Sequence, residues 1–517
     1  MPQIFTLNLF GVYNGGLNTR DDPRALPLHK SPYLRNVELR RNRVETTPGY
    51  TAHSGTDSDT AANSGIFVAR YSGNVYLLKA ENGKIKKLKV VGSSPDSAWG
   101  TLKTGLNATA RVEFAQAGNV VYATNGVNTV QKWDLATTPA STADVVAIPK
   151  GKTIAYFNQR LVVSHETDGS RFDFSNVGAY ETFPGNFKYA DQGEGGTIQR
   201  LLDTGRGQLL IMKDTGSGRY TWDGVDTSTS NPKKWSDRGT VAPRSVVMLP
   251  SGSVAFCDHE GVWLASLFEY GETPLSGEIE PTWQALNHGK LDLAAATYFD
   301  EQLLISVAES GQTTNNVTLA FDFQLADGGG WLIHDIPATA WASYIDSSGV
   351  PQIIFGDPSA NSRLFRRYQG LTASEFNFNG AAINAVYHTK EHDFHEVAPD
   401  AAGRTKIMLK KSVSTEQKGD YNLTLGWRKD NDSDFNEVLW NLLGTGTSLW
   451  SETPSDVWPE IPAPDDIWEG TQKVEGLVPS FKLRGRTEQS KVAKNAVNEP
   501  FTYFGETIHF IPLKSFT

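Results

Sequence analysis

The sequence has very little cysteine and methionine: Cys257 is the single cysteine among 517 residues, and there are four methionines. One cysteine excludes an intramolecular disulfide framework and a zinc knuckle built on paired cysteines. No stretch approaches the ~18 consecutive apolar residues of a membrane-spanning helix. The first residues lack the basic region and apolar core of a secretory signal. We therefore expect folding in a reducing compartment, without stable membrane insertion.

Basic charge is also in deficit, since 48 Lys and Arg stand against 58 Asp and Glu and leave a net charge of −10. A general nucleic-acid binder would show a basic excess, so that class is not expected. The 39% of hydrophobic residues excludes wholesale disorder. Glycine (48) and proline (25) are plentiful, which favours strands and turns over helices.

A repeated hairpin dominates residues 65–380. In each copy a short apolar or alternating run meets a turn and a second run follows, and most copies follow another apolar run. The copies begin at Gly73, Gly118, Gln159, Gly207, Gly252, Glu301 and Val350. Three to four strands per ~45 residues is the spacing of a β-propeller blade. We predict an all-β fold with a β-propeller of about seven blades, six or eight remaining open.

Two regions lie outside this repeat. Residues 1–64 are predicted to be an irregular N-terminal arm for docking or blade closure, because prolines and Gly-Gly interrupt short polar segments. Residues 381–517 are predicted to be a C-terminal, sandwich-like β module. Its strand runs begin at Ile383, Arg404, Tyr421, Ser480 and Phe501. Within it, residues 451–469 form a predicted loop that is acidic and rich in tryptophan and proline.

The sequence contains no clear catalytic pattern. P-loop, HExxH and GxSxG motifs are absent from the sequence. His388, His392 and His395 are the one histidine cluster, but a strand would send the third to the opposite face, so solvated histidines are favoured over a metal site. The Gly-rich turns at Thr167 and Thr215 loosely resemble a sialidase repeat without its Ser, Asp and Gly in register. We name no catalytic, cofactor-binding or metal-ligating residue.

Two segments are candidate interfaces. The first runs from residue 20 to 43, and its candidate residues are Arg20, Arg24, Arg35, Arg40, Arg41 and Arg43. It either docks on an acidic partner or neighbouring subunit, or wraps its own fold as a solvated segment. The second is the 451–469 loop, where Trp458 and Trp468 either anchor an interface or fold back on their own module.

Residues 14–50 (NGGLNTRDDPRALPLHKSPYLRNVELRRNRVETTPGY) contain a Gly-Gly, a Pro, a Ser-Pro, an Asn-Val segment and a closing Pro-Gly. This pattern resembles the N-terminal signature of the nozzle, or tubular B-type tail-hub, proteins of tailed phages. The stretches GTVAPRSV from Gly239 and FCDHEGVW from Phe256, followed by Ile279-Glu-Pro, are similar to the family's central motif. The C-terminal Glu499-Pro500-Phe501 resembles its closing turn.

The resemblance implies a structural virion protein, with no enzymatic activity and no cofactor. Several copies, commonly six, would form a tube below the portal and its adaptor and bear tail fibres or spikes. Genomic DNA would pass through the lumen without sequence-specific binding, and an acidic lumen would let it slide. The expected location is the phage tail, assembled in the host cytoplasm. The alternatives are a propeller adhesin or fibre-attachment hub that binds host glycan, and a propeller glycan hydrolase.

Overall fold

The computed structural model describes residues 3–513 except residues 54, 56, 58, 60, 194, 215, 228, 360–362, 402, 417, 419–420, 431, 443–472 and 479–482. Within that part the protein is all-β, as predicted. Its regular α-helix there is the short α1 (Glu280–Gln284). No helix in the described ranges is long and apolar enough to cross a membrane.

The contacts divide the chain into two units. Unit 1 comprises residues 1–50, 321–334 and 368–517, and unit 2 comprises residues 51–320 and 335–367. This division differs from the sequence-based boundaries at residues 64 and 380. Residues 1–50 group with the C-terminal residues and not with the repeat, because short strands in this segment pair with C-terminal strands.

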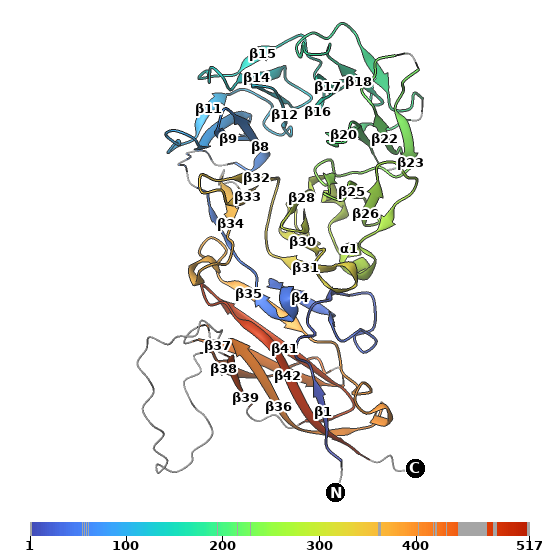
Figure 1. Ribbon diagram of the computed structural model, residues 1–517, viewed down its shortest axis with the longest axis vertical. Helices are drawn as coiled ribbons and strands as arrows, with labels where there is room; N and C mark the ends of the chain where they lie inside the picture. The colour runs from blue at the N-terminus through green and yellow to red at the C-terminus, as the bar shows by residue number, and fades with distance from the viewer. Residues whose placement is uncertain are drawn as a thin grey trace. The chain divides into compact units, whose positions relative to one another are not determined.

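Unit 2 is built of consecutive antiparallel sheets (Figure 1). The first four are β8 (Asn63–Tyr71) to β11 (Gly100–Lys103), β12 (Glu113–Ala117) to β15 (Ala143–Val145), β16 (Ile154–Phe157) to β19 (Phe187–Tyr189), and β20 (Ile198–Asp203) to β23 (Lys233–Ser236). The fifth is β24 (Val247–Met248), β25 (Ser253–Cys257), β26 (Val262–Ser266) and β27 (Thr273–Pro274). The last two contain β28 (Ala295–Phe299), β29 (Gln302–Val307) and β30 (Val317–Asp322), and then β32 (Trp341–Ile345), β33 (Pro351–Gly356), β34 (Leu364–Arg367) and β7 (Tyr50–Ala52).

The predicted hairpin positions are confirmed. The second strand of each sheet starts within two residues of a predicted repeat start, from β9 (Asn74–Glu81) to β33. These second strands are the most apolar: every residue of β21 (Leu209–Lys213) and β29 is buried. A central strand has neighbours on both edges and on both faces, so continuous burial is expected there.

The sheets of unit 2 pack face to face in sequence order. One core cluster joins the third and fourth sheets through Phe172, Phe174 and Trp222. Another joins the first sheet to the last through Leu77, Leu88 and Ile354. The first strands also contact one another, and β32 contacts β8. The last sheet of unit 2 therefore packs against the first.

Unit 1 contains two larger sheets. One has the order β39-β36-β42-β6-β5, with β1 and β40 as further partners, and the other has the order β38-β37-β41-β35-β4. The first comprises β1 (Phe5–Asn8), β5 (Val37–Glu38), β6 (Val44–Thr46), β36 (Lys406–Glu416), β39 (Lys473–Leu477), β40 (Leu483–Gly485) and β42 (Thr502–Pro512). The second comprises β4 (Tyr33–Arg35), β35 (Ile383–His388), β37 (Asn422–Lys429), β38 (Asn436–Asn441) and β41 (Glu488–Ala496).

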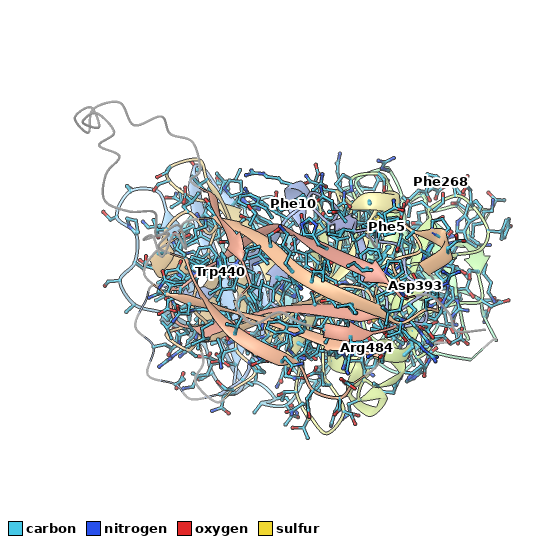
Figure 2. All side chains as sticks on the ribbon, turned by 90° about the horizontal axis from the view of Figure 1, so that it is seen from below. Phe5, Phe10, Phe268, Asp393, Trp440 and Arg484 are labelled. Atoms are coloured by element: carbon cyan, nitrogen blue, oxygen red, sulfur yellow. The ribbon has the colours of Figure 1, made fainter. Side chains whose placement is uncertain are left out.

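The N-terminal segment expected to be irregular supplies strands to both of these sheets. Phe5 of β1 stacks on Phe510 of β42 with ring centroids 5.7 Å apart (Figure 2). Tyr13 lies between the sheets, 5.4 Å from the ring of Tyr387 on β35 and 5.7 Å from the ring of Tyr503 on β42. All three tyrosines are fully buried. The ends of the chain are thus part of one core.

Candidate interaction sites

A cavity of about 390 Å³ lies at the centre of unit 2. Its walls come from the start of every sheet, and representative lining residues are Phe67, Phe114, Tyr156, Leu202, Val246, Ala296 and Trp341. Aromatic and aliphatic side chains alternate with a few charged ones. The volume is in the range of small-molecule pockets.

The charged groups of this cavity are paired with one another. Glu113 on β12 contacts the guanidinium of Arg200 on β20, and it lies 3.2 Å from Nε of Arg244. Arg244 also donates to the backbone carbonyls of Ser64 and, at 3.2 Å, Val112. Burial alone would raise the pKa of Glu113, but the two guanidinium charges outweigh it and lower that pKa. The ion pair therefore stays charged and joins four sheets at their inner edge.

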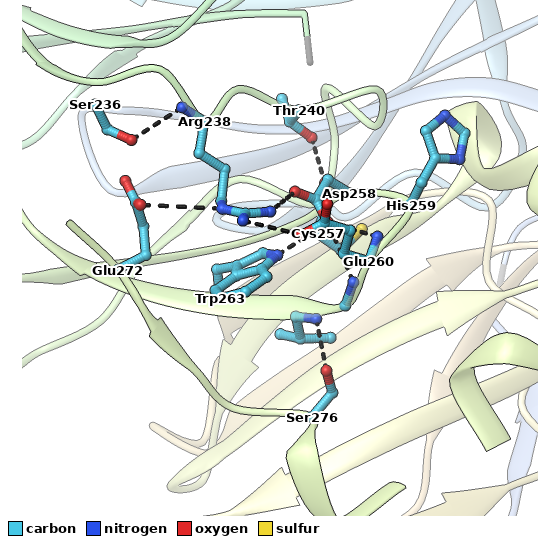
Figure 3. A network of polar contacts seen from close by, with 12 residues as sticks. Ser236, Arg238, Thr240, Cys257, Asp258, His259, Glu260, Trp263, Glu272 and Ser276 are labelled. Carbon is cyan, nitrogen blue, oxygen red and sulfur yellow. Dashed lines mark hydrogen bonds and ion pairs between the residues drawn. The ribbon is translucent and has the colours of Figure 1, made fainter. Parts of the chain in front are cut away.

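Arg244 belongs to the GTVAPRSV stretch that begins at Gly239, and Asp258 and Trp263 belong to the FCDHEGVW stretch that begins at Phe256. Asp258 and Trp263 form a second network with Arg238, which lies just before the first stretch (Figure 3). The Arg238 guanidinium lies 3.6 Å above the Trp263 ring and pairs with Asp258 at 2.5 Å. Asp258 also accepts a hydrogen bond from Trp263 Nε1 at 2.9 Å.

Cys257, beside this network, is fully buried, and burial raises its pKa to about 12. A thiol in that state has almost no thiolate at neutral pH and is inert as a nucleophile. Asp258 and Trp263 are therefore engaged in contacts with Arg238 and with each other within the fold.

The six predicted arginines of residues 20–43 all lie in unit 1, in two kinds of environment. Arg40 and Arg43 are half-buried, and they pair with Asp322 at 2.8 Å and Glu45 at 2.9 Å, respectively. Arg35 is half-buried within β4. Arg20, Arg24 and Arg41 are exposed. Arg24 pairs with its neighbour Asp22, and Arg20 reaches Asp21 at 3.4 Å.

Arg41 borders a polar pocket of about 310 Å³, which we call the Arg41 pocket. Asn14, Asn42 and Gln324 contribute to its wall. Among the described residues, none forms a hydrogen bond or ion pair with the Arg41 guanidinium. Arg41 and Asn42 have φ of +63° and +59°, in a backbone region that residues other than glycine rarely adopt. Each such residue costs ~1–3 kcal/mol, and such strain gathers at functional sites.

The three clustered histidines do not converge. The His388 ring packs between those of Tyr33 and Phe435, 5.0 and 4.8 Å away, and burial with nearby cations lowers its pKa to about 3. His392 is buried, whereas His395 is exposed. Within the described ranges, only His395 of the three lies in a group of potential ligand atoms, with Asp393 (Figure 2) and Glu396.

Neither group of potential metal ligands is free of competing cations. Lys390 pairs with Glu396 at 2.9 Å beside His395. The second group, Asp57, Asp59 and Glu81, is bridged by the Lys86 ammonium, which contacts all three carboxylates. A lysine supplies the positive charge that a metal would bring, so these groups are satisfied as ion pairs. Trp458 and Trp468 lie outside the described residues.

Sequence reasoning missed a buried polar cluster in unit 1. Lys411 on β36 contacts Ser490 and lies 3.2 Å from Glu488 and 2.8 Å from Glu506. Burial raises the pKa of Glu488 to about 7, whereas Lys411 and its hydrogen bonds lower the pKa of Glu506 despite burial. Glu488 and Ser490 alternate on β41, a pattern that normally predicts a solvent-facing side.

No protein-family model matches the chain, and no curated protein matches it. Among solved structures, the designed Ika8 protein has a TM-score of 0.39 and 10% identity over 62% of this chain and 99% of that one. YCF48 bound to D1 peptide has a TM-score of 0.38 and 13% identity over 62% and 96%. Raptor from Chaetomium thermophilum has a TM-score of 0.42 and 11% identity over 62% and 30%. At these TM-scores the likenesses assign neither a family nor an activity.

Proposed function

We propose that unit 2 is a seven-bladed β-propeller. Three observations support this reading: the sheets begin at a common cavity, the first and last sheets share a core, and β7 is the fourth strand of the last sheet. His53, just after β7, donates its backbone N–H to the Leu364 carbonyl at 2.7 Å. Pairing an early strand with the last sheet ties the beginning of unit 2 to its end and so holds a ring of sheets closed.

The chain as a whole is proposed to be a structural protein of a phage tail nozzle, without enzymatic activity. The single observation that carries this proposal is the resemblance at both ends and in the centre of the sequence. The structure adds support, because the central-motif residues Arg244, Asp258 and Trp263 serve the fold.

DNA would pass between subunits and not through a single propeller. The central cavity of about 390 Å³ is crossed by the ion pairs of Glu113. A duplex whose major groove alone is ~12 Å wide cannot enter it. A DNA-conducting tube would therefore require a ring of copies, and six is the number that the resemblance implies. The net charge of −10 would disfavour adhesion of phosphate to such a lumen.

The Arg41 pocket is the proposed docking point for an acidic segment of a neighbouring subunit, the portal adaptor or a fibre protein. An exposed guanidinium beside amide side chains offers several donors to a carboxylate. Its strained backbone is compatible with a site maintained for binding.

Localisation tests this proposal. Virions of the phage that encodes the chain would be labelled with an antibody raised against it and viewed by negative-stain electron microscopy. Label confined to the distal tail is the expected result. Label on the capsid or along the fibres would contradict the nozzle assignment, while leaving the propeller proposal to be judged separately.

A further inference from the structure

A second pocket of unit 2, of about 450 Å³, lies at the outer ends of two neighbouring sheets. One wall comes from β19 and the residues after it, and the other from β22 (Arg219–Trp222) and the segment leading into β23. Of these strands, β22 and β23 pair with each other and are labelled in the green part of Figure 1. We call it the Tyr189 pocket.

Aromatic rings form the apolar part of the Tyr189 pocket. Phe187 is 42% exposed and Tyr189 is half-buried, and their rings meet edge to face with centroids 5.5 Å apart. The Arg171 guanidinium lies 4.1 Å from the centroid of Phe187 and holds that ring in place. Tyr220 is buried and presents its hydroxyl to the pocket wall. Aromatic rings that remain partly open to water are suited to an amphipathic ligand.

The polar part is made of groups of different kinds. Asp191 lies at the wall with φ of +67°, a strained conformation for a residue with a side chain. Its Oδ2 accepts a hydrogen bond from the Tyr220 hydroxyl at 3.1 Å and lies 3.6 Å from the Lys234 ammonium. The exposed amides of Gln192 and Asn231 also line the pocket, and neither forms a hydrogen bond with another described residue.

The base of the pocket is held rigidly. Lys188, between the two aromatic residues of β19, is buried, and its ammonium donates to the Thr227 carbonyl at 2.6 Å. This bond ties β19 to the segment that carries Asn231. A pocket whose walls are fixed in this way loses little conformational entropy when it binds a ligand.

We propose that the Tyr189 pocket binds a saccharide. A sugar ring offers an apolar C–H face, which suits an aromatic ring, and neighbouring hydroxyls, which both donate and accept. The Asp191 carboxylate accepts from hydroxyls, Lys234 donates, and the Gln192 and Asn231 amides do both. A purely apolar ligand would leave the Gln192 and Asn231 amides without hydrogen bonds, and a strongly anionic one would meet the Asp191 charge.

The chemistry supports binding without hydrolysis. Glycosidic cleavage uses two carboxyl groups ~5–9.5 Å apart. Asp191 is the one carboxylate among the described residues that line the pocket. The inference does not depend on the proposed place of the chain in a virion, because a saccharide could reach this pocket in the isolated protein.

The full-length chain would be applied to an array of defined oligosaccharides, and in parallel to purified bacterial surface polysaccharides. We expect at least one of these saccharides to bind. Binding on the array alone would indicate a small free sugar as the ligand. Binding of a polysaccharide would indicate a cell-surface glycan. No binding in either format at millimolar saccharide would overturn the proposal.

Variants then assign the pocket. Tyr189→Ala should weaken binding tenfold or more, and Asp191→Asn, which preserves shape, should weaken it severalfold. Tyr71→Ala is the matched control, since Tyr71 is 38% exposed on β8 and does not line the pocket. Unfolding midpoints within 2–3 °C of the parent, a shift equivalent to ~1 kcal/mol or less, would show that each variant folds. Equal binding by the parent and both pocket variants would place the ligand elsewhere and contradict the proposal.

Discussion

At the scale of single residues, two clusters of buried charged side chains are paired within the protein. Glu113, Arg200 and Arg244 meet at the inner edge of unit 2, and Lys411, Glu488 and Glu506 meet within unit 1. Buried charges are tolerated only when they are paired and hydrogen-bonded. Their roles follow from non-local pairing, which is why the sequence alone did not reveal them.

Replacing Arg244 tests the central ion pair. Arg244→Met would remove the contacts to Glu113 and to two backbone carbonyls, and we expect the free energy of unfolding to fall by about 3 kcal/mol. Urea denaturation measures the change. Glu113→Gln/Arg244→Met also takes the carboxylate partner from Arg200, so it should lose more stability than Arg244→Met alone. A parent-like midpoint for Arg244→Met would contradict the structural role assigned to this residue.

The pH dependence of stability should change in opposite directions in two unit 1 variants. Glu488 has a pKa of about 7 in the fold against 4.5 ordinarily, so its contribution to stability is complete below pH 4.5 and is lost as the pH rises to 7. Buried His392 has a pKa of about 4 against 6.5, so its contribution is present above pH 6.5 and is lost as the pH falls to 4. In the parent protein, Glu488 and His392 therefore change the stability in opposite directions as the pH rises.

Glu488→Gln should therefore make the protein relatively more stable at pH 7 than at pH 5, and His392→Leu should make it relatively less stable. Thermal unfolding midpoints at the two pH values, compared with the parent, measure both effects. The expected difference is on the order of 1–3 kcal/mol, bounded by the pKa shifts. If the difference in midpoint between pH 5 and pH 7 changed in the same direction in both variants, Glu488 and His392 would not be the source of the pH dependence.

At the scale of elements, the local pattern predicted the strands well and the turns less well. Asn82-Gly83 has φ of +45° and +68°, as a type I′ hairpin turn requires. At Asn125-Gly126, Gly126 has positive φ but Asn125 does not, and the Asn125 side chain accepts N–H bonds from Val127 and Asn128. Because this side chain competes with the backbone for the turn, an Asn-Gly pair alone does not fix the turn type.

The tight turn at Asn158 and Gln159 carries no glycine and offers a test. Asn158 and Gln159 have φ of +46° and +55°. Gln159→Gly should raise the free energy of unfolding by about 0.5–1 kcal/mol, because glycine adopts positive φ without strain. Gln159→Ala retains the Cβ atom and should bring no gain. Chemical denaturation of both variants decides the matter, and an equal effect of alanine and glycine would exclude backbone strain as the cause.

The element arrangement also shows where sequence reasoning ends. The strands of the hairpin repeat were found because each is defined by its own alternation and turn residues. The pairing of β1 with β42 joins Phe5 to Phe510 and leaves no local signature. The Tyr189 pocket is assembled from two sheets, and Arg41 was singled out only by its charge, with no sign of its strained backbone.

At the scale of the whole molecule, the proposed tail nozzle requires several copies of this chain to assemble into a ring. The Arg41 pocket should matter for assembly and not for folding. Arg41→Glu should lower incorporation of the chain into tails at least severalfold while leaving its unfolding midpoint unchanged. Arg404→Glu, at an exposed arginine of the same unit, is the control. Quantifying the chain in purified particles by immunoblot measures incorporation, and equal incorporation of both variants would remove this pocket from the interface.

The most direct test of the central claim is the position of the chain in the virion, read by antibody labelling and negative-stain electron microscopy. We expect label at the distal end of the tail in intact particles. Label on the capsid or the fibres would contradict a tail nozzle.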